Sequence, residues 1–164
     1  MITSTSNQQM KNLSQLMKKA KTRKEQGLFV VEGRKMFQEV PKAWLRQVYA
    51  SESFVQENES LLADCAYEMV SDSVFKVVSD TQTPQGILCL VEQPSYELSD
   101  LLCGEKTHLL ILESIQDPGN LGTMLRTGEG AGITGVIMNR TTVDLFNPKT
   151  IRSTMGSIYR MPYV

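Results

Sequence analysis

Residues 111–138, ILESIQDPGNLGTMLRTGEGAGITGVIM, hold the pattern that decides the fold of this 164-residue chain. The apolar run LLIL at residues 109–112 is typical of a strand covered on both faces of an α/β sheet. The turn DPGN at residues 117–120 ends that strand, with Asn120 as the expected helix N-cap, and apolar residues then recur at helical spacing. Residues 135–138 predict the next strand. Such a unit places a loop and a helix N-terminus at the carboxyl end of a strand, where open α/β sheets bind ligands.

Arg126 is the candidate reactive residue of this unit. Gly122 and Thr123, which precede it by one turn, leave room for its guanidinium group. Five fixed donors suit a phosphate or a developing oxyanion. The alternative is an ordinary surface arginine that pairs with Glu129 or Asp117.

Composition excludes several classes of protein. No run approaches the roughly 20 apolar residues of a membrane helix, and the N-terminus lacks the apolar stretch of a signal peptide. Cys65, Cys89 and Cys103 are odd in number and lack metal-ligand spacing, so we expect free thiols in a reducing cytoplasm and no metal site. His108 is the only histidine, which leaves no material for a zinc site or a Ser-His-Asp triad.

Charge is distributed unevenly along the chain. Residues 1–35 hold eight Lys/Arg against two Glu, whereas residues 36–100 hold three against eleven acidic residues. A basic terminal segment beside an acidic remainder favours contact with nucleic-acid phosphates over a merely solvated helix face. The candidate phosphate contacts are Lys18, Lys19, Arg23 and Arg34.

Helix and strand patterns alternate regularly over the first 95 residues. A helix from Asn7 to Gly27 is followed by predicted strands at residues 28–31, 47–50, 67–70 and 86–91, with helices at 34–40, 57–64 and 71–78. This order predicts a three-layer α/β sandwich with a small central sheet. The polar segment 92–97 is the expected linker to a second domain at residues 98–164, in which Asn147 caps a helix that begins at Pro148.

Several ordered motifs resemble one family. QDPGNLGTMLRT at residues 116–127, AGI at 131–133, NPK at 147–149 and RSTMG at 152–156 closely resemble the first motif region of the SpoU-type (TrmH-like) RNA ribose methyltransferases, which belong to the knotted SPOUT class. The upstream segment resembles the family's substrate-binding domain, which shares its fold with kink-turn-binding ribosomal proteins. The matching upstream residues are Ile2 to Ser4, Asn7, Lys11, Leu13, Lys18, Lys19, Arg23, Gly27, 29–33 and 83–87.

The resemblance implies an α/β fold in two parts. A ribosomal-protein-like, three-layer RNA substrate-binding domain at residues 1–95 would precede the N-terminal part of a SPOUT (α/β knot) methyltransferase domain at residues 98–164. The sequence stops before the family's second and third motifs, so we expect this chain to be inactive alone and its S-adenosylmethionine pocket to lie beyond Val164. The implied protein is a cytoplasmic, homodimeric, S-adenosylmethionine-dependent RNA 2′-O-methyltransferase. Ribosomal RNA is favoured because a separate substrate domain is present.

The resemblance also implies roles for individual residues. It places the family's invariant arginine and asparagine at Arg126 and Asn120, with Arg126 activating and positioning the ribose hydroxyl electrostatically. Glu113 either orients Arg126 or is a solvated loop carboxylate. The implied substrate-binding residues are Lys18, Lys19, Arg23, Glu32, Gly33, Arg34, Asn147, Arg152 and Ser153.

Other interpretations stay open from the residues alone. Asn147, Arg152 and Ser153 fit a helix cap, a surface charge and helix packing equally well. A noncatalytic RNA-binding module would also carry the basic N-terminal helix. A dinucleotide oxidoreductase ranks third, because the turn reads Gly-x-x-Gly and lacks the Gly-x-Gly-x-x-Gly pattern.

Overall fold

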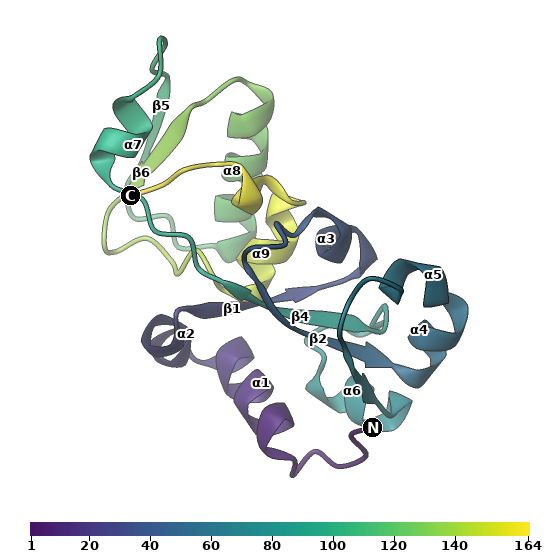
Figure 1. Cartoon of the computed structure of the whole chain (residues 1–164). Helices are drawn as coiled ribbons and strands as arrows, with labels where there is room; N and C mark the ends of the chain where they lie inside the picture. The colour runs from purple at the N-terminus through teal and green to yellow at the C-terminus, as the bar shows by residue number, and fades with distance from the viewer. The chain divides into compact units, whose positions relative to one another are not determined.

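The computed structural model describes residues 1–164, which divide into two compact units, Met1–Gln93 and Pro94–Val164 (Figure 1). The first unit is built on a four-stranded sheet of β1 (Leu28–Glu32), β2 (Leu45–Ser51), β3 (Glu68–Val70) and β4 (Ile87–Glu92). The strand order is β1-β4-β2-β3, with β4 antiparallel to β1 and β2, and β2 parallel to β3. The carboxyl ends of β1, β2 and β3 therefore meet at one edge of the sheet.

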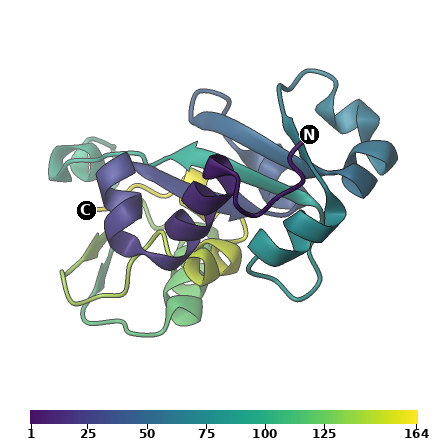
Figure 2. The ribbon, with the colours of Figure 1, turned by 90° about the horizontal axis from the view of Figure 1, so that it is seen from below.

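Helices cover both faces of this sheet. One face carries α1 (Gln8–Lys18), α2 (Ala20–Gln26) and α6 (Asp72–Val78), which lie in front of the strands when the molecule is seen from below (Figure 2). The other face carries α3 (Arg34–Glu39), α4 (Glu52–Glu57) and α5 (Glu59–Leu62) (Figure 1). Met10, Leu13, Leu16 and Met17 of α1 are buried in the core between these layers. The predicted three-layer α/β fold is confirmed.

Two helix boundaries differ from the prediction. The helix expected from Asn7 to Gly27 is broken at Lys19, whose backbone is extended (φ −121°, ψ 113°). The helix expected at residues 57–64 is instead the pair α4 and α5, separated at Asn58. Spacing of apolar residues continues across such breaks, so periodicity alone does not reveal them.

Arg23 explains how the chain turns after α1. Its side chain is buried, with 3% of its surface exposed, and Nη1 donates hydrogen bonds to the carbonyl oxygens of Leu16 (2.5 Å) and Met17 (3.1 Å). These are last-turn carbonyls of α1, which have no partner within the helix. The assignment of Arg23 as a phosphate contact is therefore wrong, because its guanidinium group is committed to holding α1 and α2 together.

The second unit contains a two-stranded parallel sheet, β5 (Leu109–Leu112) and β6 (Gly135–Met138), joined by α8 (Pro118–Gly130). The helix α7 (Leu98–Leu102) precedes β5, and α9 (Pro148–Thr154) and a 3-10 turn (Ser157–Tyr159) follow β6. A further bridge joins Val136 to Tyr163, so the last residues extend the sheet. The core of this unit contains Leu121, Leu125, Val136, Ile151 and Ile158.

The N-cap of α8 is Asp117 and not Asn120. The Asp117 carboxylate accepts a hydrogen bond from the backbone N–H of Asn120 (2.7 Å), and Pro118 occupies the first helical position. A residue before proline favours extended backbone, and Asp117 has ψ 120°, so the helix begins after it. Asn147 caps α9 as predicted, since its side chain accepts from the backbone N–H of Lys149 (2.9 Å).

The helices α8 and α9 approach each other at a glycine. A Cβ atom placed on Gly122 would lie 2.4 Å from the Thr150 carbonyl oxygen and 2.5 Å from Ser153 Cβ. Only a residue without a side chain permits this approach. None of the helices is long and apolar enough to cross a membrane.

Candidate functional site

The carboxyl ends of β5 and β6 are continued by two polar loops that lead into α8 and α9. Asp117 at the start of α8 forms an ion pair with Lys149 in the first turn of α9 (3.4 Å). The hydrogen bond from the Asn120 backbone, helped by Lys149, lowers the pKa of the Asp117 carboxyl below its ordinary value. Asp117 and Lys149 thus hold the two helix N-termini together, a pairing that spacing along the sequence does not predict.

A second set of contacts fixes the loop between β5 and α8. Ser114 has the left-handed backbone that is rare for residues other than glycine (φ 55°). Its backbone N–H donates to Asn139 Oδ1 (2.9 Å), its hydroxyl lies 2.6 Å from Thr141 Oγ1, and Gln116 Nε2 donates to the Thr141 carbonyl (2.8 Å). A strained residue held by several partners is typical of a functional loop.

Arg126 lies on α8 with an exposed side chain that forms no ion pair or hydrogen bond. The two partners considered from the sequence are occupied elsewhere. Asp117 pairs with Lys149, and Glu129 pairs with Arg160, whose Nη2 lies 3.2 Å from Glu129 Oε2. The guanidinium group of Arg126 is therefore available to an external anion.

Asn120 is exposed in the first turn of α8, and its side-chain amide has no hydrogen-bond partner. Because Asp117 caps the helix, the amide of Asn120 is free to donate to or accept from a substrate. Glu113 follows β5 and is also exposed, but no hydrogen bond links it to Arg126. The structure thus leaves an exposed amide in the first turn of α8 and an exposed cation two turns further along the same helix.

The three predicted residues of α9 have structural partners. Asn147 is the N-cap, and the Ser153 hydroxyl donates to the Lys149 carbonyl (2.9 Å) while its Cβ lies against Gly122. Arg152 is half-buried in the last turn. Their clearest contribution is to position α8 through the contact between the two helices.

This arrangement suits stabilisation of negative charge. A guanidinium group can donate two parallel hydrogen bonds to a phosphate or an oxyanion, and an amide can both donate and accept. No group of three or more His, Cys, Asp or Glu side chains is placed to hold a metal ion.

The first unit presents its own set of predicted contacts. Lys18 and Lys19 are exposed where α1 ends, as a phosphate contact requires. Glu32 is partly buried, unlike the two lysines. Its carboxylate accepts hydrogen bonds from the hydroxyls of Ser79 and Thr81 (2.5 Å each). The prediction that Glu32 binds substrate is therefore replaced by a structural role, in which it ties the loop before β4 to the end of β1.

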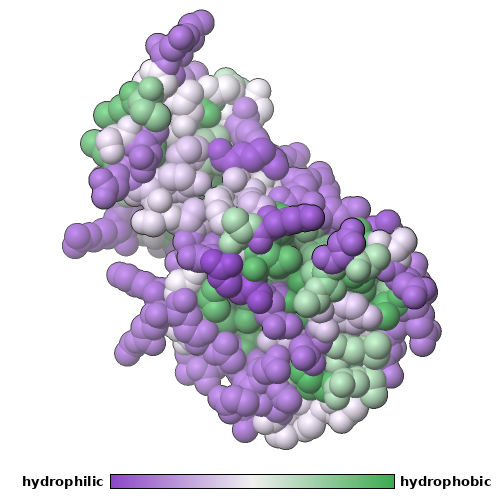
Figure 3. Space-filling view, in the orientation of Figure 1, coloured by the Kyte–Doolittle hydropathy of each residue, from purple (hydrophilic) through white to green (hydrophobic).

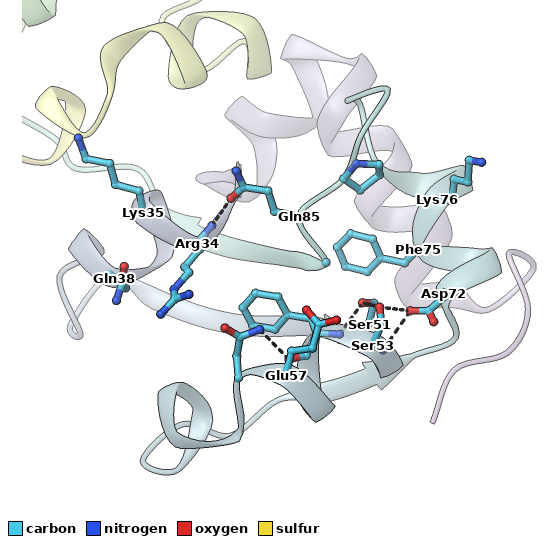
Figure 4. Close-up of a pocket in the computed structure, with 14 residues that line it drawn as sticks. Arg34, Lys35, Gln38, Ser51, Ser53, Glu57, Asp72, Phe75, Lys76 and Gln85 are labelled. Carbon is cyan, nitrogen blue, oxygen red and sulfur yellow. Dashed lines mark hydrogen bonds between the residues drawn. The ribbon is translucent and has the colours of Figure 1, made fainter.

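A cavity of about 820 Å³ opens beside that loop, at the carboxyl ends of β1, β2 and β3 (Figure 4). Arg34 follows Gly33 on its wall, and the Arg34 backbone N–H donates to Gln85 Oε1 (2.8 Å). Hydrogen bonds from the Ser53 backbone and hydroxyl lower the pKa of the Asp72 carboxyl. No pattern in the sequence predicts this cavity, because the segments that line it come from four different places along the chain.

Two sequence families match the chain in succession. Residues 7–89 match the MRM3-like substrate binding domain, and residues 107–164 match the SpoU rRNA Methylase family. The 23S rRNA (guanosine(2553)-2′-O)-methyltransferase RlmP of Bacillus subtilis is 33% identical over 99% of this chain, which spans 64% of that protein. The human mitochondrial rRNA methyltransferase 3 is 32% identical over 91% of this chain and 37% of its own length.

Solved structures show the same arrangement of elements. An AdoMet-bound rRNA methyltransferase from Sinorhizobium meliloti superposes with a TM-score of 0.83 at 28% identity, over 99% of this chain and 63% of that one. The chain thus spans slightly less than two thirds of these two bacterial proteins.

Proposed function

Because this chain belongs to the SpoU family of RNA methyltransferases and carries an MRM3-like substrate-binding domain, we propose that its protein methylates the ribose 2′-hydroxyl of a ribosomal RNA nucleotide. The observation that carries the proposal is the exposed, unpaired Arg126 on α8, the helix that joins β5 to β6. The name of the Bacillus subtilis relative supports ribosomal RNA as the substrate.

Arg126 has two tasks in this reaction. A ribose hydroxyl is a poor nucleophile, and negative charge develops on its oxygen as the methyl group arrives. The guanidinium group stabilises that charge and holds the adjacent phosphate, which orients the hydroxyl. A guanidinium group has five N–H donors and no acceptor, so Arg126 acts as a donor and not as a general base. Asn120 assists by hydrogen bonding to the same nucleotide through its free amide.

S-adenosylmethionine is the methyl donor of this family, as the AdoMet-bound neighbour illustrates. Both cavities that we describe, of about 820 and 600 Å³, are lined by residues of the first unit. We therefore assign no residue of this chain to the cofactor.

The two units divide the work in this proposal. Residues 1–95 bind the RNA, with Lys18, Lys19, Gly33 and Arg34 at phosphates, and residues 98–164 form the N-terminal part of the SPOUT methyltransferase domain. Asn147, Arg152 and Ser153 support the catalytic helix and border its RNA. Exposure of both lysines and the match of residues 7–89 to a substrate-binding domain favour this division.

We also propose a homodimer and a cytoplasmic location. Leu98 and Leu102 of α7 expose 51% and 48% of their surfaces. The region of α7 carries a hydrophobic area in the space-filling view (Figure 3). These two leucines offer an apolar surface for a second copy. All three cysteines are free thiols, which favours a reducing compartment.

The test is a map of 2′-O-methyl groups on ribosomal RNA from cells that lack the gene. We expect one ribose methylation to disappear and to return when the RNA is incubated with the purified protein and S-adenosylmethionine. An unchanged map would contradict the proposal and favour a noncatalytic RNA-binding protein.

A further inference from the structure

The chain passes from the first compact unit to the second between Gln93 and Pro94. Gln93 is held by the first unit in two ways. Its backbone N–H donates to the Gly27 carbonyl oxygen (2.8 Å), and its side-chain Nε2 donates to the carbonyl oxygens of Arg23 (3.2 Å) and Leu28 (3.0 Å). Because both the backbone nitrogen and the side chain of Gln93 are held, its φ torsion is fixed.

Pro94 is held by the second unit through the hydroxyl of Tyr163, which donates a hydrogen bond to the Pro94 carbonyl oxygen (2.6 Å). Burial raises the pKa of this hydroxyl above its ordinary value of 10.0, so the group keeps its proton at neutral pH and acts as a donor. The proline ring locks the φ torsion of Pro94 at about −65°. The direction of the carbonyl group sets the ψ torsion of Pro94, so the hydrogen bond fixes that torsion as well.

The side chain of Tyr163 is itself restrained by packing. Its ring makes edge contacts with the rings of Tyr96 and Phe146, at centroid distances of 5.4 and 5.9 Å. Its backbone pairs with Val136 of β6. The hydroxyl therefore reaches Pro94 from a fixed position in the second unit.

We propose that the ψ torsion of Gln93 is the one free backbone torsion between the two units, and that the Tyr163 hydroxyl keeps the connection in this state. The peptide bond that follows this torsion is planar. A residue before proline favours extended backbone, which narrows the ψ torsion of Gln93 to about +120° to +160°. Without the hydroxyl, the ψ torsion of Pro94 becomes a second free torsion.

The consequence for methyl transfer rests on the proposed function. RNA that is held by one unit meets the other unit at an effective concentration that the connection sets. A connection with one narrow torsion concentrates the RNA in few arrangements, and each freed torsion spreads it over more of them. Tyr163 is therefore a positioning residue for methyl transfer, which acts through the backbone of Pro94.

The first experiment tests the connection without RNA, by ¹⁵N relaxation of backbone amides in the purified protein. We expect the heteronuclear NOE of Ser95 and Tyr96 to equal that of β4 in the wild type, and that of Ser95 to fall in Tyr163→Phe. Tyr67→Phe is the matched control, because the Tyr67 hydroxyl forms no hydrogen bond in the first unit and its loss should change neither value. A low value at Ser95 in the wild type, or an unchanged value in Tyr163→Phe, would overturn the inference.

The second experiment measures single-turnover methyl transfer at saturating ribosomal RNA, where weaker binding does not lower the rate. Freeing one backbone torsion should slow the reaction about twofold to fivefold in Tyr163→Phe. Insertion of two glycines between Gln93 and Pro94 frees several torsions and should slow it more than about tenfold. Tyr67→Phe should react at the wild-type rate. An insertion that leaves the rate unchanged would refute the positioning role.

The two proposals fail in different ways. If the wild type and all variants methylate ribosomal RNA at the same rate, the positioning role is wrong and the proposed function stands. If the wild type does not methylate ribosomal RNA, the proposed function is wrong, and the NOE values of Ser95 decide the proposal about the connection.

Discussion

Replacing Gly122 by alanine should destabilise the second unit by about 2 kcal/mol. The added methyl group would lie 2.4 Å from a backbone oxygen of Thr150, which can yield only if α9 moves. Thr150 and Ile151 are fully or almost fully buried, so α9 has little room to shift. Overpacking of this kind costs about 3 kcal/mol at the upper end, and the higher helix propensity of alanine offsets about 1 kcal/mol.

Thermal unfolding followed by circular dichroism measures this effect. For a unit of this size, 2 kcal/mol corresponds to a fall in melting temperature of roughly 8–16 °C. Gly130 is the matched control on the same helix, because a Cβ atom there meets nothing within 4 Å. Gly130→Ala should leave stability unchanged or raise it by up to about 1 kcal/mol. Equal melting temperatures for the two variants would refute the close approach of α8 and α9.

Three further predictions concern residues outside the helix contact. Lys18→Ala with Lys19→Ala should reduce the magnitude of the slope of log affinity for ribosomal RNA against log salt by about one unit per lost phosphate contact. An unchanged slope would exclude both lysines as phosphate contacts. Arg23→Ala should lower the free energy of unfolding by about 1.5–3 kcal/mol in urea denaturation, because last-turn carbonyls of α1 lose a charged donor; a surface residue would show almost no change. The pKa of the Asp117 carboxyl is below its ordinary value of 3.8 in the folded protein. The ionised carboxylate therefore stabilises the fold fully above pH 3.8, and this stabilisation is lost as the pH falls through the lowered pKa of the folded state. The melting temperature of Asp117→Asn should therefore fall less than that of the wild type as pH is lowered from 5 to 2, and parallel curves would argue against the cap.

Local patterns carried most of the fold prediction. The β5–α8–β6 unit followed from an apolar run, a Pro-Gly turn and helical spacing, all within 30 residues. The four strands of the first unit and the cap of α9 by Asn147 were also predictable, because each depends on neighbouring residues. The exchange of Asn120 for Asp117 as N-cap follows from the proline after Asp117, a local signal that outweighs the preference of asparagine for caps.

Roles that depend on distant partners were not predictable. Arg23 looked like one more cation in a basic segment, but its guanidinium group lies in the bend between two helices. Glu32 looked like part of a binding motif, and its partners lie 47 and 49 residues further along the chain. Spacing along one helix or strand contains no information about such contacts. For the same reason the sequence does not show that Arg126 is unpaired, because this depends on Asp117 and Glu129 having other partners.

The most direct test of the proposed chemistry is single-turnover methyl transfer to ribosomal RNA by the wild-type protein and its Arg126→Ala variant, with the melting temperature of each. Since the exposed guanidinium group supports no contact in the folded protein, we expect the melting temperature to stay within about 2 °C. The rate should fall roughly 10²–10³-fold, as when one preorganised donor is removed, and Arg126→Lys should also be severely impaired because an ammonium group lacks the planar fork. A near-normal rate in Arg126→Ala would contradict the account.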